Sequence, residues 1–186
     1  MKTTAVYTPL QRTLHWLMAV LILGMLCVGF YIHGLDAENA AEAPIKSSLG
    51  ALHKATGMVV LLLAFIRFGV LHRSGKPALP DGTPDWQRKA AKLSHVLLYL
   101  LMFAMPLSGY VMSSYAQRPV NMYGLFELPM LPFEKNIDMA KAVFEVHEIL
   151  AWTLVVLIAI HLGGALRHHF IQKDIVLRRM LLGRTD

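Results

Sequence analysis

Residues 143–169 read VFEVHEILAWTLVVLIAIHLGGALRHH, an apolar run that carries histidines near its start and toward its end. A helix that crosses a lipid bilayer needs about 20 predominantly apolar residues. This run is long enough, and its centre is apolar all round rather than on one face, as lipid-facing helices must be. We therefore expect residues 143–169 to form a membrane-spanning helix.

Three further apolar runs precede it, at residues 10–33, 49–72 and 92–115. Apolar residues make up 55% of the 186-residue chain and charged residues only 16%, whereas about a quarter of a soluble domain is charged. The sequence thus predicts an all-α integral membrane four-helix bundle, with residues 1–186 as one domain. The first run is too long for a cleavable signal peptide, so we expect it to remain as a span.

The basic residues gather on one side of these spans and predict the orientation of the chain. That side holds Lys2, Arg12, Arg67, Arg73, Lys76, Arg88, Lys89, Lys92, Arg167, Lys173, Arg178, Arg179 and Arg184. The other side holds Lys46, Lys54, Arg118, Lys135 and Lys141, and it is rich in acidic residues. Because cytoplasmic loops carry the excess of Lys and Arg, both termini are expected in the cytoplasm. The net charge of +6 could suggest a nucleic-acid partner, but the basic residues lie at the ends of the spans and do not form a phosphate-binding stripe. We therefore expect no nucleic-acid partner.

The connection at residues 116–140 is rich in aromatic residues and proline. Two interpretations stay open: a lid that folds onto the bundle, or an interfacial loop with aromatic anchors in membrane lipid. Cys27 is the only cysteine, which excludes an intrachain disulfide and a multi-cysteine iron–sulfur site.

The histidines are the candidate functional residues, since nine of them are many for so apolar a chain and an ionisable group in a span is costly. His147 and His161 are 14 residues apart, nearly four helical turns, so they share one helix face. That spacing separates them by about 21 Å along the axis. His15 starts the first span at the depth of His161, and His53 starts the second at the depth of His147. Two pairs follow: His15 with His161, and His53 with His147.

Each pair would bring two neutral imidazoles together between facing helices, where they can bind both axial positions of one haem iron. The predicted iron ligands are therefore His15, His53, His147 and His161. Small residues near the ligands would let the macrocycle approach, although glycine in a span also serves helix packing. They are Gly50, Ala51, Gly57, Gly163, Gly164 and Ala165.

Three assignments stay open. His168 lies one heptad after His161 and competes as a ligand, but it sits among charged residues at the membrane edge, so we favour His161. His95 has no partner in the two-pair scheme; it bonds a haem propionate, lines a quinone site or is an interfacial histidine. Arg67 pairs with a propionate or snorkels to the headgroups.

Taken together, these residues resemble the prokaryotic cytochrome b561 family, which is related to the cytochrome b subunits of nickel–iron hydrogenases and membrane formate dehydrogenases. The matching motifs are His15-Trp16, His53-Lys54-Ala55-Thr56-Gly57, Ser94-His95, His147-Glu148, His161, Arg167-His168-His169-Phe170 and Lys173-Asp174. The resemblance covers essentially the whole chain. It implies two bis-histidine haems b with ligands from the first, second and fourth spans, and a place in the bacterial inner membrane.

The resemblance also implies electron exchange between a periplasmic-side donor and a quinone such as ubiquinone. Some members of the family resemble superoxide oxidases, and Lys54 beside His53 would help to attract the superoxide anion. A second interpretation makes the chain the membrane anchor of a larger complex, fed by a partner dehydrogenase or haem protein through residues 116–140. A third, a histidine-lined metal transporter or structural protein, is disfavoured because the span interiors lack the carboxylates that zinc sites commonly use.

Overall fold

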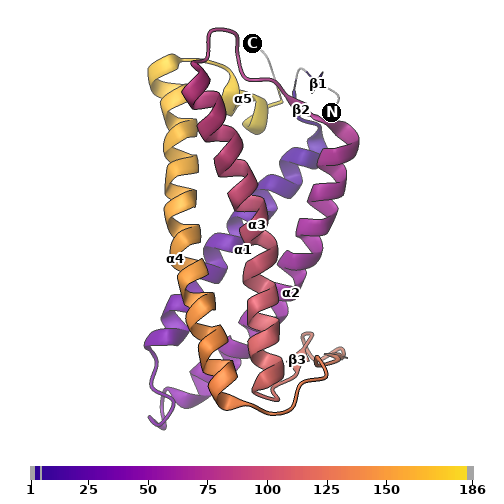
Figure 1. Ribbon diagram of the computed structural model, residues 1–186, viewed down its shortest axis with the longest axis vertical. Coiled ribbons are helices and arrows are strands. Elements are labelled where there is room, and N and C mark those ends of the chain that lie inside the picture. The colour runs from indigo at the N-terminus through magenta and orange to yellow at the C-terminus, as the bar shows by residue number, and fades with distance from the viewer. Residues whose placement is uncertain (1–2, 5, 184–186) are drawn as a thin grey trace. The chain divides into compact units, whose positions relative to one another are not determined.

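Four long helices make up most of the computed structural model, which describes residues 3–4 and 6–183 (Figure 1). They are α1 (Pro9–Gly34), α2 (Ala43–Ser74), α3 (Asp85–Tyr115) and α4 (Ile137–Arg167). Each is long and apolar enough to cross a membrane. The predicted all-α architecture with four membrane-spanning helices is confirmed. Lys2 and Arg184, two of the basic residues used to predict orientation, lie outside the described residues.

Three helices begin before the apolar runs that predicted them. The predicted starts at residues 49, 92 and 143 are replaced by starts at Ala43, Asp85 and Ile137. For α4 the reason is a helix cap, because the side-chain oxygen of Asn136 accepts a hydrogen bond from the N–H of Met139 (2.9 Å). The residues before each predicted start include charged side chains, among them Lys46, Arg88 and Lys141, so a search for uninterrupted apolar runs does not reach the true helix starts.

The fourth span ends differently from the other three. After α4 the helix widens into a π-helical turn, η1 (His168–Gln172). Lys173 then takes a left-handed conformation with φ 52°, which ends the helix and turns the chain into the short helix α5 (Val176–Leu181). His168 therefore lies beyond the α-helical part of the span.

Contacts divide the chain into two compact units, and every long helix contributes to both. Unit 1 contains Met1–Leu17, Leu63–Leu101 and Trp152–Asp186. Unit 2 contains Met18–Leu62 and Met102–Ala151. Both ends of the chain thus belong to unit 1, together with the α2–α3 connection.

The N-terminal segment of unit 1 pairs with the α2–α3 connection. Strand β1 (Thr3–Thr4) lies parallel to strand β2 (Lys76–Pro77), and the two are neighbours in Figure 1. The side chain of Gln11, which is buried, donates a hydrogen bond to the carbonyl of Gly75 (2.7 Å). A buried polar group without a hydrogen-bond partner is destabilising, and this bond gives the Gln11 side chain a partner. The contact therefore favours the pairing of the N-terminal segment with the α2–α3 connection.

The C-terminal helix α5 is attached to the same unit by side-chain donors. Trp16 Nε1 donates to the carbonyl of Met180 (3.2 Å), and Arg179 donates to the carbonyl of Ala78 (2.7 Å). The carbonyl of Met180 lies in the last turn of α5 and has no partner within that helix, so the bond from Trp16 satisfies it, whereas Ala78 lies in the α2–α3 connection. Trp16 stands directly beside His15, which links α5 to the neighbourhood of a candidate site residue.

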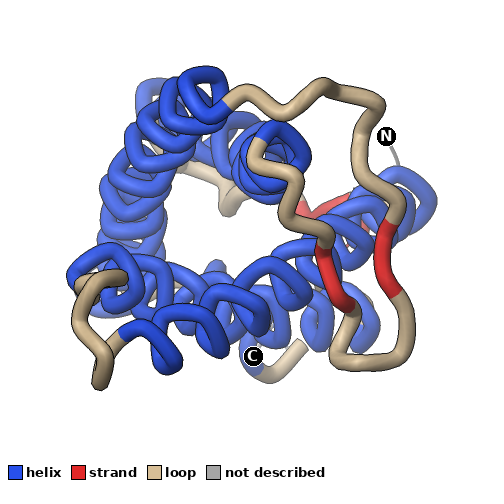
Figure 2. The backbone as a smooth tube through the Cα atoms, turned by 90° about the horizontal axis from the view of Figure 1, so that it is seen from below, coloured by secondary structure: helices blue, strands red, loops and turns tan. Residues whose placement is uncertain are grey.

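In unit 2 the α3–α4 connection contains a small hairpin of β3 (Val120–Asn121) and β4 (Glu127–Leu128), the antiparallel red strands at the right of Figure 2. Its turn places Tyr123 and Gly124 in the left-handed region (φ 55° and 80°). The hydroxyl of Tyr123 is hydrogen-bonded to Thr56 of α2 (3.0 Å). This connection therefore contacts α2 directly.

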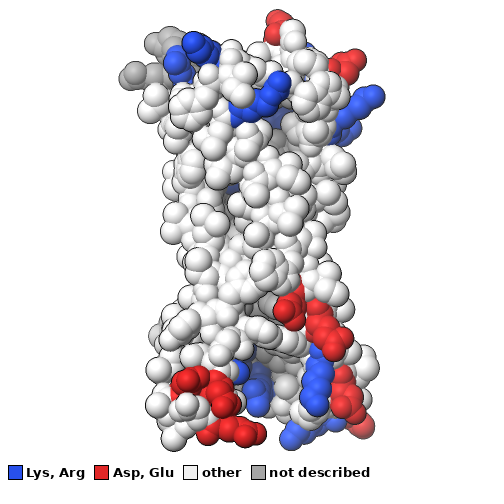
Figure 3. All heavy atoms as spheres, turned by 90° about the vertical axis from the view of Figure 1, so that its left-hand side faces the viewer, with Lys and Arg blue, Asp and Glu red and all other residues white. Residues whose placement is uncertain are grey.

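The outer surfaces of the helices are apolar. Large aliphatic and aromatic side chains are exposed on all four, with Val20 69% and Ile149 66% exposed. On the face drawn in Figure 3 the charged side chains gather near helix ends and leave the surface between uncharged. Extended exposed apolar surface of this kind indicates contact with lipid.

Candidate functional site

Unit 1 brings three histidines from three helices together. The ring centres of His15 on α1 and His161 on α4 lie 6.2 Å apart. His95 on α3 lies nearer to His161, with a ring-centre distance of 5.3 Å. The expected pair of His15 and His161 is thus adjacent, and His95 joins it.

Unit 2 brings the other expected pair together. The ring centres of His53 on α2 and His147 on α4 lie 6.4 Å apart. Each unit therefore contains one pair of facing imidazoles, and α4 supplies one imidazole to each. In the described part of the chain, no three His, Cys, Asp or Glu side chains are arranged so that together they could hold a bare metal ion.

The spacing of both pairs suits a metal bound between two imidazoles. A bond of about 2.0 Å joins a metal to each ring nitrogen, and each nitrogen lies about 1.15 Å from its ring centre, so two centres on opposite sides of the metal fall about 6.3 Å apart. The pairs at 6.2 and 6.4 Å match this value. The His95–His161 distance of 5.3 Å is about 1 Å too short. The donor sets therefore fit haem iron.

Two glycines lie against the paired imidazoles of unit 2. A Cβ atom at Gly29 on α1 would lie 3.1 Å from Cε1 of His53, and a Cβ atom at Gly109 on α3 would lie 3.4 Å from Cε1 of His147. The first distance is tighter than ordinary carbon contacts of 3.5–4.0 Å. Both glycines thus let a neighbouring helix approach a ligand candidate.

The glycines predicted to let the macrocycle approach make no such contact with an imidazole, and their role toward the macrocycle stays a prediction. A Cβ atom at Gly50, Gly163 or Gly164 would have no neighbouring atom within 4 Å, and one at Gly57 would contact only Met25 (3.6 Å). The close approach to the imidazoles comes from the facing helices instead, because side chains on neighbouring helices meet across the interior.

The 14-residue spacing between His147 and His161 recurs on the other three helices. A search for it in the sequence would have pointed to Gly29 and Gly109 as site residues. Gly29 follows His15 by 14 residues, and Gly109 follows His95 by 14 residues. Arg67 follows His53 by the same interval. Fourteen residues are close to four helical turns, so the two residues of each pair lie on the same face of their helix. One residue of each pair belongs to unit 1 and the other to unit 2.

The ring nitrogens of the unit 2 pair differ in their partners. Nδ1 of His147 lies 2.8 Å from Oγ of Ser108. Nδ1 of His53 is buried and has no hydrogen-bond partner among the described residues. Ser108 was not predicted as a site residue, since a serine in an apolar helix gives no signal of its own.

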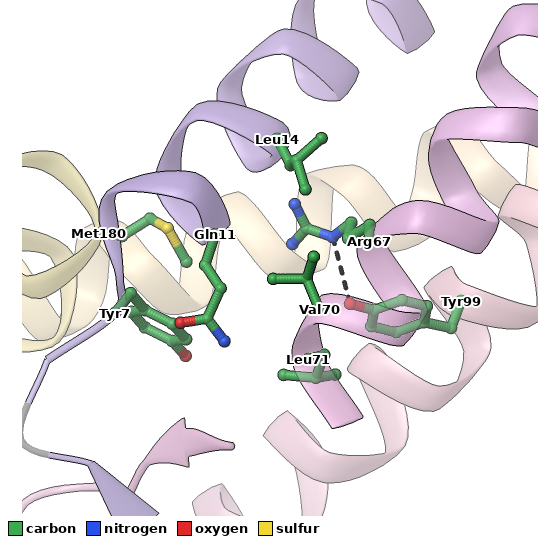
Figure 4. Close-up of a pocket in the computed structure, with 8 residues that line it drawn as sticks. All are labelled: Tyr7, Gln11, Leu14, Arg67, Val70, Leu71, Tyr99 and Met180. Carbon is green, nitrogen blue, oxygen red and sulfur yellow. Dashed lines mark hydrogen bonds between the residues drawn. The ribbon is translucent and has the colours of Figure 1, made fainter. Parts of the chain in front are cut away.

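Arg67 contacts one of the histidines. Its Nη2 donates to Nδ1 of His15 (3.0 Å), and its Nε donates to the hydroxyl of Tyr99 (3.2 Å), the dashed bond in Figure 4. The remaining nitrogen, Nη1, is buried without a partner. One donor of this cation therefore remains for another acceptor.

The Arg67 side chain lines a small cavity in unit 1, of about 20 Å³, which is room for about one water molecule. Figure 4 shows Gln11, Leu14 and Tyr99 around it. Tyr7 also lines the cavity, and burial raises the pKa of its phenol above the ordinary value. The phenol is therefore neutral at physiological pH and offers a hydrogen-bond donor.

The two remaining candidates have partners of their own. Nδ1 of His168 is hydrogen-bonded to the Asp174 carboxylate (2.5 Å), which attaches η1 to the segment before α5. Nζ of Lys54 donates to the carbonyl of Pro119 (3.1 Å), which attaches α2 to the α3–α4 connection. In the part of the chain that the structure describes, His168 faces an aspartate instead of a second imidazole.

Comparison with known proteins gives relatives along almost the whole chain. The family model described as prokaryotic cytochrome b561 matches residues 6–183. Cytochrome b561 homolog 2 of Escherichia coli is 36% identical, over 94% of this chain and 90% of that protein. Cytochrome b561 homolog 1 of the same organism is 30% identical, over 94% and 96%. The probable superoxide oxidase CybB of Yersinia pestis is 25% identical, over 94% and 95%. The chain therefore belongs to the prokaryotic cytochrome b561 family, whose members bind haem b and transfer electrons at the membrane.

Proposed function

We propose that this chain is a dihaem cytochrome b, with one haem bound by His15 and His161 and another by His53 and His147. The observation that carries the proposal is the pair of ring-centre distances, 6.2 and 6.4 Å, each close to the separation of two imidazoles on one metal. When bound, haem supplies one-electron redox chemistry. The chain supplies the axial ligands and their surroundings.

The ligand type favours electron transfer over chemistry on the iron. Two imidazoles would hold the iron from both sides and would leave no position for a substrate to bind the metal. The helices around the pairs are apolar, and a low dielectric strengthens the influence of each nearby charge and hydrogen bond on the reduction potential. The few polar groups close to the histidines, such as Arg67 and Ser108, are therefore the ones expected to tune the potentials.

Arg67 is proposed as a partner of a haem propionate. Its contact makes Nδ1 of His15 a hydrogen-bond acceptor, because a guanidinium can only donate. A neutral imidazole that binds iron through Nε2 carries its proton on Nδ1, so the guanidinium must then exchange this contact for another. A propionate is an anionic acceptor that would favour the exchange, and the buried Nη1 offers a second donor.

The proposed electron route joins a donor on the periplasmic side to the quinone pool, with ubiquinone as the acceptor. Helix α4 supports it, because it carries one ligand of each haem. The bias of Lys and Arg supports cytoplasmic termini in a bacterial inner membrane, and the basic residues Arg73, Arg88 and Arg178 belong to the same unit as those termini.

Superoxide is the proposed donor. One relative bears the name probable superoxide oxidase, and the ammonium group of Lys54 stands next to His53 in the chain. A cation near the haem ligand would raise the local concentration of an anionic substrate. Lys54→Met should lower the rate of superoxide-dependent ubiquinone reduction several-fold at low salt. Lys46→Met is the matched control, because Lys46 also donates to a loop carbonyl, that of Leu35 (2.6 Å). Equal rates in both variants would contradict superoxide steering by Lys54.

A second candidate function is that of a membrane anchor which receives electrons from a partner dehydrogenase or haem protein. The hairpin tip of the α3–α4 connection favours it, since Leu125 is 81% exposed and Phe126 56% exposed. Turnover of superoxide by the isolated chain would argue against this function. Co-purification of a redox partner that is lost from a Leu125→Ser variant would support it.

The first experiment is a reduced-minus-oxidised visible spectrum of the purified protein with a pyridine haemochrome count. Two b haems per chain are expected. Replacement of His147 or His161 by alanine should reduce the count to about one. A folded wild-type chain, expressed with adequate haem supply, that contains no haem would refute the proposal.

A further inference from the structure

Ser108 on α3 stands between a ligand candidate and a backbone carbonyl. Its Oγ lies 2.8 Å from Nδ1 of His147 and 2.8 Å from the carbonyl oxygen of Met105. Both distances are normal for hydrogen bonds. The hydroxyl therefore links the imidazole to the backbone of a different helix.

The chemistry of the three groups decides where the protons lie. A carbonyl oxygen can only accept, so both contacts are hydrogen bonds at once only when the single hydroxyl hydrogen of Ser108 is donated to Met105. The hydroxyl oxygen is then an acceptor, and the hydrogen bond to His147 requires a proton on Nδ1. A neutral imidazole with its proton on Nδ1 has a free lone pair on Nε2, which is the atom left for a metal.

We propose that Ser108 is a positioning residue that keeps His147 in the iron-binding tautomer and lowers the reduction potential of the haem that His147 binds. A hydrogen bond accepted from Nδ1–H raises the basicity of the ligand and favours ferric over ferrous iron. This inference rests on the proposed function, because it requires that His147 binds haem.

The surroundings of His147 are built for this arrangement. Gly109, next to Ser108, lies so close that a Cβ atom there would be 3.4 Å from Cε1 of the His147 ring. Gly109 and the hydrogen bond with Ser108 thus both meet the Nδ1–Cε1 edge of the ring, where they limit rotation of the imidazole. His53, the opposite ligand candidate, has no partner for its buried Nδ1 among the described residues, so the hydrogen bond acts on one axial ligand of the pair.

The experiment is a potentiometric titration of both haems in the purified holoprotein, with the haem of His15 and His161 as the internal reference. Ser108→Ala should raise the ferrous-to-ferric ratio of one haem about threefold at a fixed potential, which corresponds to about 28 mV for one electron. The second haem should not change. The electron paramagnetic resonance signal of the same ferric haem should shift, because its ligand donates less strongly.

Matched variants test the role of the hydroxyl. Ser108→Thr keeps a hydroxyl and should retain the wild-type potential, whereas Ser108→Cys, with a weaker acceptor, should shift in the same direction as Ser108→Ala. Ser113→Ala removes another buried serine side chain from α3 and should shift neither potential. If Ser108→Ala loses one haem while Ser108→Thr keeps both, the positioning role is supported.

Two results would overturn the inference: unchanged potentials in Ser108→Ala and Ser108→Cys with both haems bound, or a downward shift in Ser108→Ala, which would show that the hydroxyl does not act as an acceptor for the Nδ1 proton of His147. Both results leave two haems in the wild-type protein, so the proposed function would stand. A wild-type chain that lacks a haem at His147 would overturn both.

Discussion

The ring centres of His95 and His161 lie 5.3 Å apart, closer by about 1 Å than those of His15 and His161 at 6.2 Å. Three helices thus bring histidines together in unit 1, yet only the longer distance leaves room for a metal between the rings. Proximity alone would have selected His95 as the partner of His161. The distance required by two coordination bonds favours His15 instead and supports the proposed pair.

This geometry predicts different haem contents for two variants. His15→Ala should reduce haem from two per chain to about one, because it removes an axial ligand. His95→Ala should retain two haems, with at most a shift in one potential. The pyridine haemochrome count measures both. Retention of two haems in His15→Ala together with loss of one in His95→Ala would reverse the assignment.

Gly29→Ala should disturb the haem held by His53. The new methyl group would lie 3.1 Å from Cε1 of His53, so either the imidazole or α1 must move. Haem content of that site should fall several-fold in limiting haem, because changes to the residues that orient a ligand commonly weaken metal binding. Gly24→Ala on the same helix is the control, because its methyl group would meet nothing within 4 Å. An equal effect of both variants would point to a general loss of helix packing.

Arg67→Gln should lower the potential of the haem bound by His15 and His161. A nearby cation favours the ferrous form, which carries one positive charge fewer than the ferric form. For a charge about 10 Å away at an effective dielectric constant of about 20, its removal lowers the ferrous-to-ferric ratio roughly tenfold. Tyr99→Phe removes a hydrogen-bond partner of Arg67 but no charge, and it serves as the control. An upward shift in Arg67→Gln would contradict the proposal.

His168→Ala should keep both haems and loosen the C-terminal segment. The side chain is hydrogen-bonded to Asp174, and the N–H of Asp174 donates to the carbonyl of His168 (3.1 Å). Loss of the side-chain bond should speed amide hydrogen exchange in Val176–Leu181 about tenfold. Loss of one haem in this variant would instead make His168 a ligand and displace His161.

The sequence by itself predicted the features that depend on one helix at a time. Lipid requires long apolar helices, so residues 10–33, 49–72, 92–115 and 143–169 identified the four spans, although three helices begin earlier than expected. Helical periodicity placed His147 and His161 on one face, and it grouped His15 and His53 with them by depth. Residue type then indicated haem, because paired imidazoles suit its iron.

Tertiary structure decided everything that depends on contacts between helices. The 14-residue period shows that Gly29 and Gly109 share faces with histidines, but only packing shows which imidazole each glycine meets. The same holds for Ser108, whose neighbours in the chain are apolar and whose partner His147 lies on another helix. Helical periodicity in the sequence shows which face of a helix turns inward. Which residue on a neighbouring helix a side chain then contacts depends on the rotation and spacing of the two helices, and the sequence of one helix does not determine these.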